Sequence, residues 1–70
     1  MIRQPVSSSN LRSVGYDTNT WILEIEFRKG RVYQYYDVPE DIYNQLVTAR
    51  SKGTFHNDYI RNNYRYLRIL

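Results

Sequence analysis

The clearest structural signal in this chain is the segment Trp21-Ile22-Leu23-Glu24-Ile25-Glu26-Phe27-Arg28. Apolar and charged side chains alternate along it with a period of two, which is typical of a strand with one buried face and one face in water. Its core-facing residues are predicted to be Trp21, Leu23, Ile25 and Phe27. This is the clearest strand pattern in the sequence, and the neighbouring elements are placed around it.

Further strands are predicted on both sides of this segment. Residues 11–16 place Val14 and Tyr16 two apart, which suits a short first strand, and residues 17–20 have the composition of a turn. Residues 31–36 are rich in strand-forming side chains and follow Lys29-Gly30, a pair typical of a hairpin loop. The three segments therefore predict an antiparallel meander.

The register of the predicted hairpin has two alternatives. With a two-residue loop, Phe27 faces Val32 and the core side of the third strand carries Gln34. With a three-residue loop, Phe27 faces Tyr33, and Tyr33 and Tyr35 point to the core. We favour the second register, because an amide side chain buried without a partner costs free energy.

Two helices are predicted after the strands. Pro39 at the first helical position, followed by two acidic residues, is typical of a helix start, and apolar residues recur with helical spacing up to Arg50. Gly53 is predicted to end this helix. Thr54 is predicted to cap a second, shorter helix that runs to about Arg61.

The fold class that follows is α+β. We predict a three-stranded antiparallel β-meander followed by two α-helices packed on one face (βββαα), with a short C-terminal tail that is a weak strand or an extended fold-back. Residues 1–70 form a single domain, since a chain of this length has room for one small core. Residues 1–8 are predicted to be a flexible or extended arm.

Composition narrows the classes of function. The chain has no cysteine, which removes thiolate catalysis and every Cys-based metal site. Its longest apolar run, at residues 21–23, is far shorter than the roughly 20 residues that a bilayer span needs, and no signal-peptide pattern is present. We therefore expect a cytoplasmic protein with no membrane partner.

The charge is unevenly spread. Ten basic and seven acidic residues give a net charge of +3, and the surplus lies near the C-terminus, where the cations are expected to converge on one electropositive surface. Arginine interleaved with tyrosine in that region is typical of RNA-contacting segments, which combine phosphate contact with base stacking. The predicted nucleic-acid-binding residues are Arg28, Lys29, Arg31, Arg50, Lys52, Arg61, Tyr64, Arg65, Tyr66 and Arg68.

No catalytic, cofactor or metal site is predicted. Glu24 and Glu26 would lie about 7 Å apart on one strand face, a spacing that paired carboxylates can use in acid–base catalysis. The preferred interpretation is a solvated face with cationic neighbours such as Arg12 or Arg31. His56 is the only histidine and cannot build an ordinary zinc site, so a surface or capping role is preferred for it.

The residues as a set resemble a known family. The similarity rests on Ser7-Ser8-Ser9, Val14-Gly15-Tyr16-Asp17, Leu23 to Phe27, Gly30, Tyr33-Gln34-Tyr35, Val38-Pro39, Tyr43, Leu46, Ala49, Ser51, Gly53, Phe55, Asn57 and Ile60. Over roughly residues 6–66 the chain resembles the KTSC domain, which occurs at the C-terminus of some lysyl-tRNA synthetases and as stand-alone bacterial and phage proteins. The resemblance includes the family's Tyr-x-Tyr motif at Tyr33 and Tyr35, and it implies RNA binding.

We therefore expect a small non-enzymatic binding module. The leading hypothesis is that it binds RNA or another single-stranded nucleic acid through the basic C-terminal residues and their tyrosines. The alternative is a protein-interaction module, in which a partner chain docks on exposed aromatic residues and a sheet edge. Tyr33 and Tyr35 fit base stacking or the core, and the favoured register places them in the core.

Overall fold

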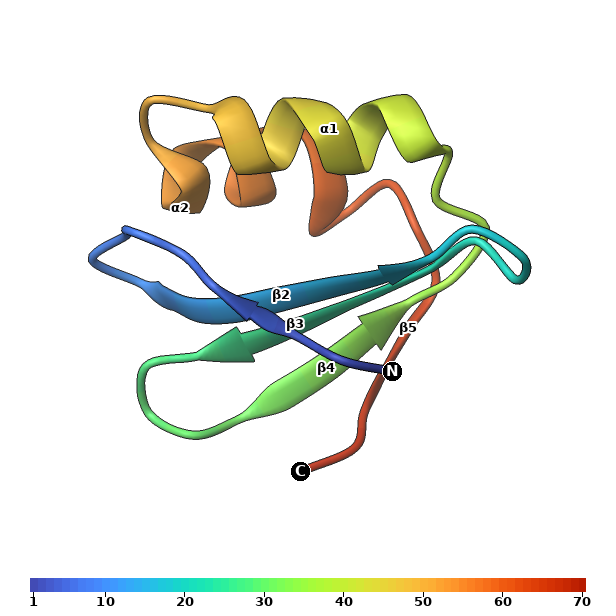
Figure 1. The fold of residues 1–70 in the computed structure, drawn as a ribbon, viewed down its shortest axis with the longest axis horizontal. Coiled ribbons are helices and arrows are strands. Elements are labelled where there is room, and N and C mark those ends of the chain that lie inside the picture. The colour runs from blue at the N-terminus through green and yellow to red at the C-terminus, as the bar shows by residue number, and fades with distance from the viewer.

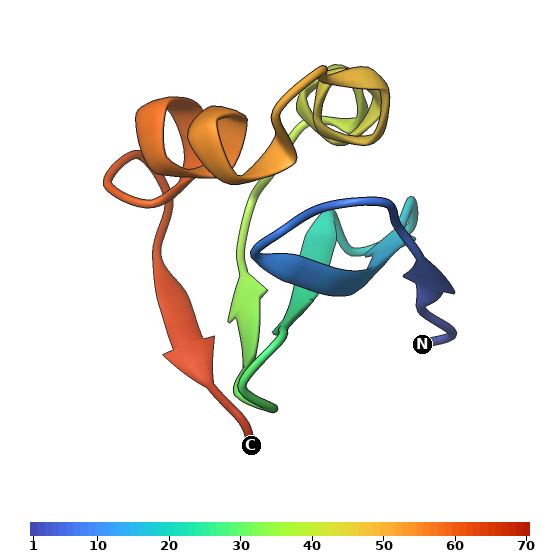
Figure 2. The same ribbon diagram turned by 90° about the vertical axis from the view of Figure 1, so that its left-hand side faces the viewer.

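A five-stranded antiparallel sheet carries all the helices on one of its faces (Figure 1). The computed structural model describes residues 1–70. Its strands are β1 (Gln4–Pro5), β2 (Leu11–Asp17), β3 (Ile22–Phe27), β4 (Val32–Tyr35) and β5 (Tyr66–Arg68). Their order in the sheet is the same as their order in the sequence. The helices are α1 (Glu40–Thr48), α2 (Lys52–Phe55) and the π-helical turn η1 (His56–Ile60). The two termini lie at opposite edges of the sheet (Figure 2).

The prediction of a three-stranded sheet was wrong, because each end of the chain adds an edge strand. Gln4 and Pro5 pair with β2, and β5 pairs with β4, with Tyr66 opposite Tyr35. β1 has two residues, one of them a proline, and all three residues of β5 are exposed. Neither segment shows the alternation of buried and exposed side chains by which a strand is found in a sequence.

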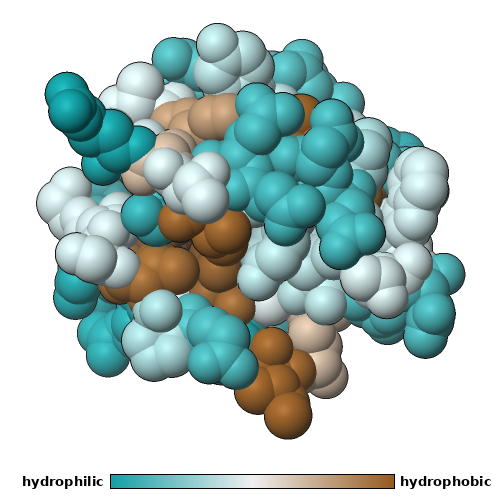
Figure 3. Space-filling model, turned by 45° about the horizontal axis from the view of Figure 1, so that its top comes forward, coloured by the Kyte–Doolittle hydropathy of each residue, from teal (hydrophilic) through white to brown (hydrophobic).

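The core lies between the sheet and the helices. Its fully buried members are Leu11, Val14, Leu23, Ile25, Tyr35, Val38, Leu46 and Ile60. Seen from the helix side, the surface is mostly hydrophilic, with hydrophobic residues visible between the polar ones (Figure 3). Neither α1 nor α2 has the length and apolar character needed to cross a bilayer.

Trp21 does not belong to the strand, which corrects the predicted core face. β3 begins at Ile22, whereas Trp21 has φ = 59° and is half exposed. Its backbone N–H donates to the carbonyl of Asp17 at 2.8 Å and closes the β2–β3 turn. The left-handed backbone breaks the alternation at this residue, so the side chain leaves the face that Leu23 and Ile25 occupy.

The β3–β4 hairpin has a three-residue loop, but its register differs from both predicted ones. Phe27 lies opposite Arg31, and its N–H donates to the Arg31 carbonyl at 2.8 Å. The predicted Phe27–Tyr33 pair is therefore wrong. The predicted faces are nevertheless confirmed: Tyr33 and Tyr35 lie on the helix side and Gln34 on the other. The favoured register differs from the observed one by two residues, and a shift of two leaves each side chain on the same face of the sheet.

The boundary between the helices also differs from the prediction. The residue that caps α2 is Ser51 rather than Thr54, since the Ser51 hydroxyl accepts a hydrogen bond from the Thr54 N–H at 3.3 Å. Gly53 lies within α2 instead of ending α1. A Cβ on Gly53 would lie 2.5 Å from Nδ2 of Asn10, so the glycine lets α2 approach the loop before β2.

The sheet face turned away from the helices holds the acidic residues of β3. Glu24 is buried, pairs with Arg3 and accepts a hydrogen bond from Nε2 of Gln34 at 2.9 Å. The expectation of a solvated carboxylate is therefore wrong for Glu24. Glu26 lies 3.9 Å from Nε of Arg12, the neighbour predicted for this face.

The approach of residues 1–3 to β2 depends on Gly15. A Cβ at this position would lie 2.9 Å from the carbonyl oxygen of Ile2 and 3.2 Å from Cγ of Arg3. We expect Gly15→Ala to push residues 1–3 away and to lower the free energy of unfolding by about 1–3 kcal/mol, as overpacking does. Urea unfolding measures the change. In a chain that lacks residues 1–3 the same substitution should cost nothing, and an equal cost in both chains would refute this account.

Candidate functional site

Three adjoining depressions surround His56 between the β3–β4 hairpin and the segment α2–η1. Their volumes are about 230, 300 and 380 Å³, and His56 lines all three. Phe27 and Arg31 are shared by the first two, Arg61 by the first and third, and Asn10 and Gly53 by the second and third. We call this surface the His56 groove.

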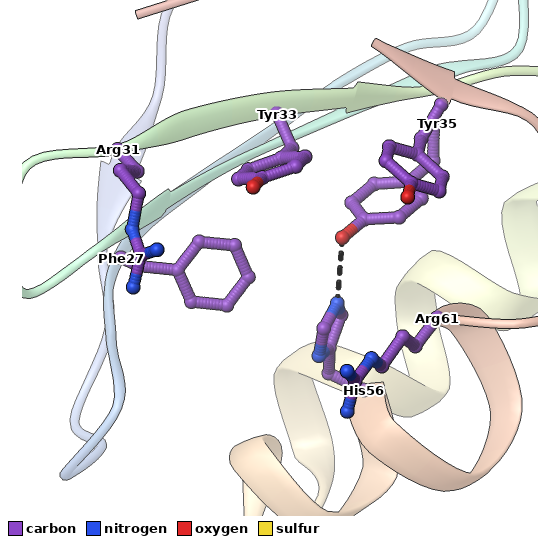
Figure 4. A pocket seen from close by; sticks show the side chains of 7 residues that line it. Phe27, Arg31, Tyr33, Tyr35, His56 and Arg61 are labelled. Carbon is purple, nitrogen blue, oxygen red and sulfur yellow. Dashed lines mark hydrogen bonds between the residues drawn. The ribbon is translucent and has the colours of Figure 1, made fainter. Parts of the chain in front are cut away.

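One end of the groove is an aromatic pocket (Figure 4). Its rings belong to Phe27, Tyr33, Tyr35, His56 and Tyr66. The strand register produces this gathering, because Tyr33 and Tyr35 share the helix side of β4 and Tyr66 lies opposite Tyr35 on β5. Tyr66 has its ring centroid 5.7 Å from that of Tyr33 and 5.8 Å from that of Tyr35. These contacts are in the range of favourable aromatic pairs.

The charged side chains that line the groove are all cationic. They are Arg28, Lys29, Arg31 and Arg61, and no aspartate or glutamate lines any of the three depressions. Arg61 donates to Oδ1 of Asn57 at 3.1 Å. This partner is neutral, and Arg61 forms no ion pair with an acidic side chain. The charged lining of the groove is therefore entirely positive.

His56 and Tyr35 form a buried polar pair at the floor of the aromatic pocket. Nε2 of His56 lies 2.7 Å from the Tyr35 hydroxyl (Figure 4), and the two residues are 9% and 3% exposed. Burial, with the nearby charge of Arg61 as a smaller cause, lowers the pKa of His56 to about 4. Burial likewise raises the pKa of Tyr35 to about 12. The predicted surface position of His56 is therefore wrong, whereas the capping alternative agrees with its place at the C-cap of α2.

The tautomer of His56 follows from this pair. The Tyr35 hydroxyl has no other acceptor, so we assign its proton to the bond with Nε2, and His56 then carries its own proton on Nδ1. Nδ1 has no hydrogen-bond partner within the protein. Since every fully buried side-chain nitrogen or oxygen has such a partner, Nδ1 is not one of the fully buried atoms. Figure 4 shows this nitrogen turned away from Tyr35. His56 thus offers a neutral N–H donor to the groove.

The structure brings together some of the predicted binding residues and separates others. The groove contains Arg28, Lys29, Arg31, Arg61 and Tyr66. The residues that lie outside it are Arg50, Lys52, Tyr64, Arg65 and Arg68.

Several of the cations outside the groove bind partners within the protein. Arg65 lies 3.1 Å from the Asp37 carboxylate, and Lys52 donates to the Ala49 carbonyl at 3.2 Å. Arg68 donates to the carbonyl of Leu70 at 3.0 Å. Of these three cations, Arg65 alone has an acidic partner, whereas Lys52 and Arg68 have backbone carbonyls as partners.

Phe27, His56 and the polar side chains of Asn10 and Asn57 belong to the groove but were not predicted as site residues. They come from three separate segments of the chain, and no local pattern in the sequence links them. No cluster of three or more histidine, aspartate or glutamate side chains is arranged to hold a metal ion.

The fold and its residues match known proteins. The family model described as KTSC domain matches residues 7–64. The crystal structure of a KTSC domain protein from Yersinia pestis superposes with a TM-score of 0.93 at 43% sequence identity, over 99% of this chain and 97% of its own.

Two further relatives are similar in sequence. An uncharacterized protein of Stutzerimonas stutzeri is 43% identical over 70 residues, which is 99% of each chain. A lysine–tRNA ligase of Nostoc punctiforme is 34% identical over 58 residues, which is 83% of this chain and 10% of the ligase.

Protonation of His56 should destabilise the fold. Its pKa is about 4 in the folded chain and has an ordinary value of 6.5, so the unfolded chain takes up this proton first as the pH falls. The free energy of unfolding should therefore decrease between pH 6.5 and 4, by at most about 3 kcal/mol from this group. Urea unfolding across this range should show a shallower decrease in His56→Gln, and equal pH dependence in the two proteins would contradict the assignment.

Proposed function

This chain belongs to the KTSC domain family, and from that premise we propose that it is a non-enzymatic module that binds single-stranded nucleic acid, RNA above all, along the His56 groove. The observation that carries the proposal is the lining of the groove, which combines four cations, no acidic side chain and a cluster of aromatic rings. Phosphate contact and base stacking are the two interactions on which single-strand binding depends.

The cations are distributed along the groove. Arg31 and Arg61 line the aromatic pocket, while Arg28 and Lys29 extend the positive charge into the neighbouring depression beside the hairpin loop. Arginine suits phosphate because its planar guanidinium can donate two parallel hydrogen bonds. A strand that follows this path would release counterions at each phosphate that it brings to a cation.

The relatives support RNA as the polyanion. The lysine–tRNA ligase of Nostoc punctiforme contains a segment that is 34% identical to most of this chain. That enzyme acts with a tRNA according to its name, and a domain with a cationic groove is suited to contact the RNA backbone. We extend contact with the RNA backbone to the present chain as part of the proposal.

The titration behaviour of the groove supports binding rather than catalysis. General acid–base catalysis near neutral pH works best with groups whose pKa lies near 7. The pKa of His56 is about 4 and that of Tyr35 about 12, and each side chain is the hydrogen-bond partner of the other. Both groups therefore stay neutral around pH 7, and in this proposal they contribute to the shape and the polarity of the site rather than to proton transfer.

A second candidate function is protein binding at the β5 edge of the sheet. β5 pairs with β4 on one side only, and both Leu67 within β5 and Leu70 after it are exposed. A partner strand could pair with the free edge, as in other sheet-edge interactions. Loss of partner binding on replacing Leu67 by Glu, with no effect of replacing Arg61 by Glu, would favour this candidate over nucleic acid.

Neutralising the groove cations should weaken RNA binding in a salt-dependent way. We expect Arg31→Gln and Arg61→Gln each to lower affinity for a short fluorescent single-stranded RNA, and to reduce the slope of log affinity against log salt by about 0.7 per lost phosphate contact. Fluorescence anisotropy at several ionic strengths measures both quantities.

Arg50→Gln is the matched control, because Arg50 is an exposed arginine outside the groove. It should leave the affinity and the slope nearly unchanged. Equal losses in the three variants, or no RNA binding by the unaltered protein at micromolar concentration in low salt, would reject the proposed function.

A further inference from the structure

We propose that the aromatic pocket holds one unstacked base of the bound strand, so that the groove selects single-stranded over duplex nucleic acid. This inference rests on the proposed function and adds to it the position of one base of the ligand and the physical basis of a preference over duplex. Its own support comes from the size and the rings of the pocket, and the arginines that carry the proposed function add hydrogen-bond donors beside those rings.

The pocket has the size for one ring system. Its volume of about 230 Å³ lies below the range of about 300–1,000 Å³ that is usual for pockets that take drug-sized ligands. The pocket is open on the side of Tyr66, which is 57% exposed, so a base can enter from solvent.

Tyr33 and Tyr66 present the stacking surface. They stand on the neighbouring strands β4 and β5, and their ring planes meet at 48° across 5.7 Å. The exposed ring of Tyr66 would lose contact with water when a base stacks on it. Such stacking depends on the ring face that every base has, so it tolerates different base sequences.

The pocket also presents donors to the polar edge of a nucleotide. Arg31 and Arg61 line it from the hairpin side and from the end of η1 respectively (Figure 4). The Nδ1–H of His56 is turned away from Tyr35 (Figure 4) and adds a neutral donor to the groove beside the pocket, suited to a phosphate oxygen. A base could then stack on tyrosine while its flanking phosphates meet the two arginines.

Duplex nucleic acid cannot supply such a base without a further cost. A paired base must leave its stack and its partner before it can enter a pocket, which costs free energy, whereas a base of a single strand is already free to turn out. The pocket should therefore distinguish the two forms of nucleic acid, whereas a cationic surface alone binds both.

The test uses three probes with the same number of phosphates per strand: a short oligouridine RNA, its abasic counterpart, and a duplex RNA. The unaltered protein should bind oligouridine most tightly. Tyr66→Ala should weaken that binding about tenfold, the loss expected for one base–aromatic stack, and should remove the preference over the abasic strand. The salt slope should stay the same, because no phosphate contact is lost.

Tyr59→Ala is the matched control. Tyr59 is 55% exposed, close to the 57% of Tyr66, but it packs on Phe55 and lies outside the groove. It should bind all three probes as the unaltered protein does. Should Tyr66→Ala disturb β5, Tyr66→Thr provides a second variant that keeps a strand-forming side chain without the ring.

The outcomes separate this inference from the proposed function. Equal affinity of the unaltered protein for oligouridine and its abasic counterpart, or equal losses in Tyr66→Ala and Tyr59→Ala, would overturn the base pocket. In either case a salt slope that depends on Arg31 and Arg61 would leave the proposed function standing. Binding to none of the probes would overturn both.

Discussion

The hydrogen bond between Tyr35 and His56 is the contact on which the groove depends. It joins the central part of the sheet to the helical layer, and each buried group satisfies the other. A buried polar atom that loses its partner costs about 1–3 kcal/mol, so the pair constrains how α2 and η1 lie over β4. It also sets the tautomer of His56 and thereby the donor that faces the groove.

The distribution of charge follows from the two faces of the sheet. The acids of β3 lie on the face away from the helices, where Glu24 pairs with Arg3 and Glu26 lies near Arg12. The groove lies on the helix side, and every charged side chain that lines it is cationic. A chain with a net charge of only +3 can therefore present a strongly positive surface, because its negative groups are placed elsewhere.

The groove draws on segments that are far apart in the sequence. The loop before β2, the β3–β4 hairpin and the turn η1 all lie within residues 7–64, the region that matches the KTSC family. Tyr66 lies just beyond the end of that region, which is at residue 64, and belongs to the edge strand β5. The mouth of the aromatic pocket thus depends on the pairing of β5 with β4.

Local signals in the sequence were enough to find the alternation in β3, the start of α1, and the face of the sheet that Tyr33 and Tyr35 occupy. They left the C-terminal tail open between a weak strand and a fold-back. They did not reveal β1, the burial of His56 or the pairing of Arg65 with Asp37, which required the folded structure. The physical reason is that periodicity and helix-start signals act between near neighbours in the chain. Edge pairing, burial and the partner of a charge are set by segments that meet only after the chain has folded.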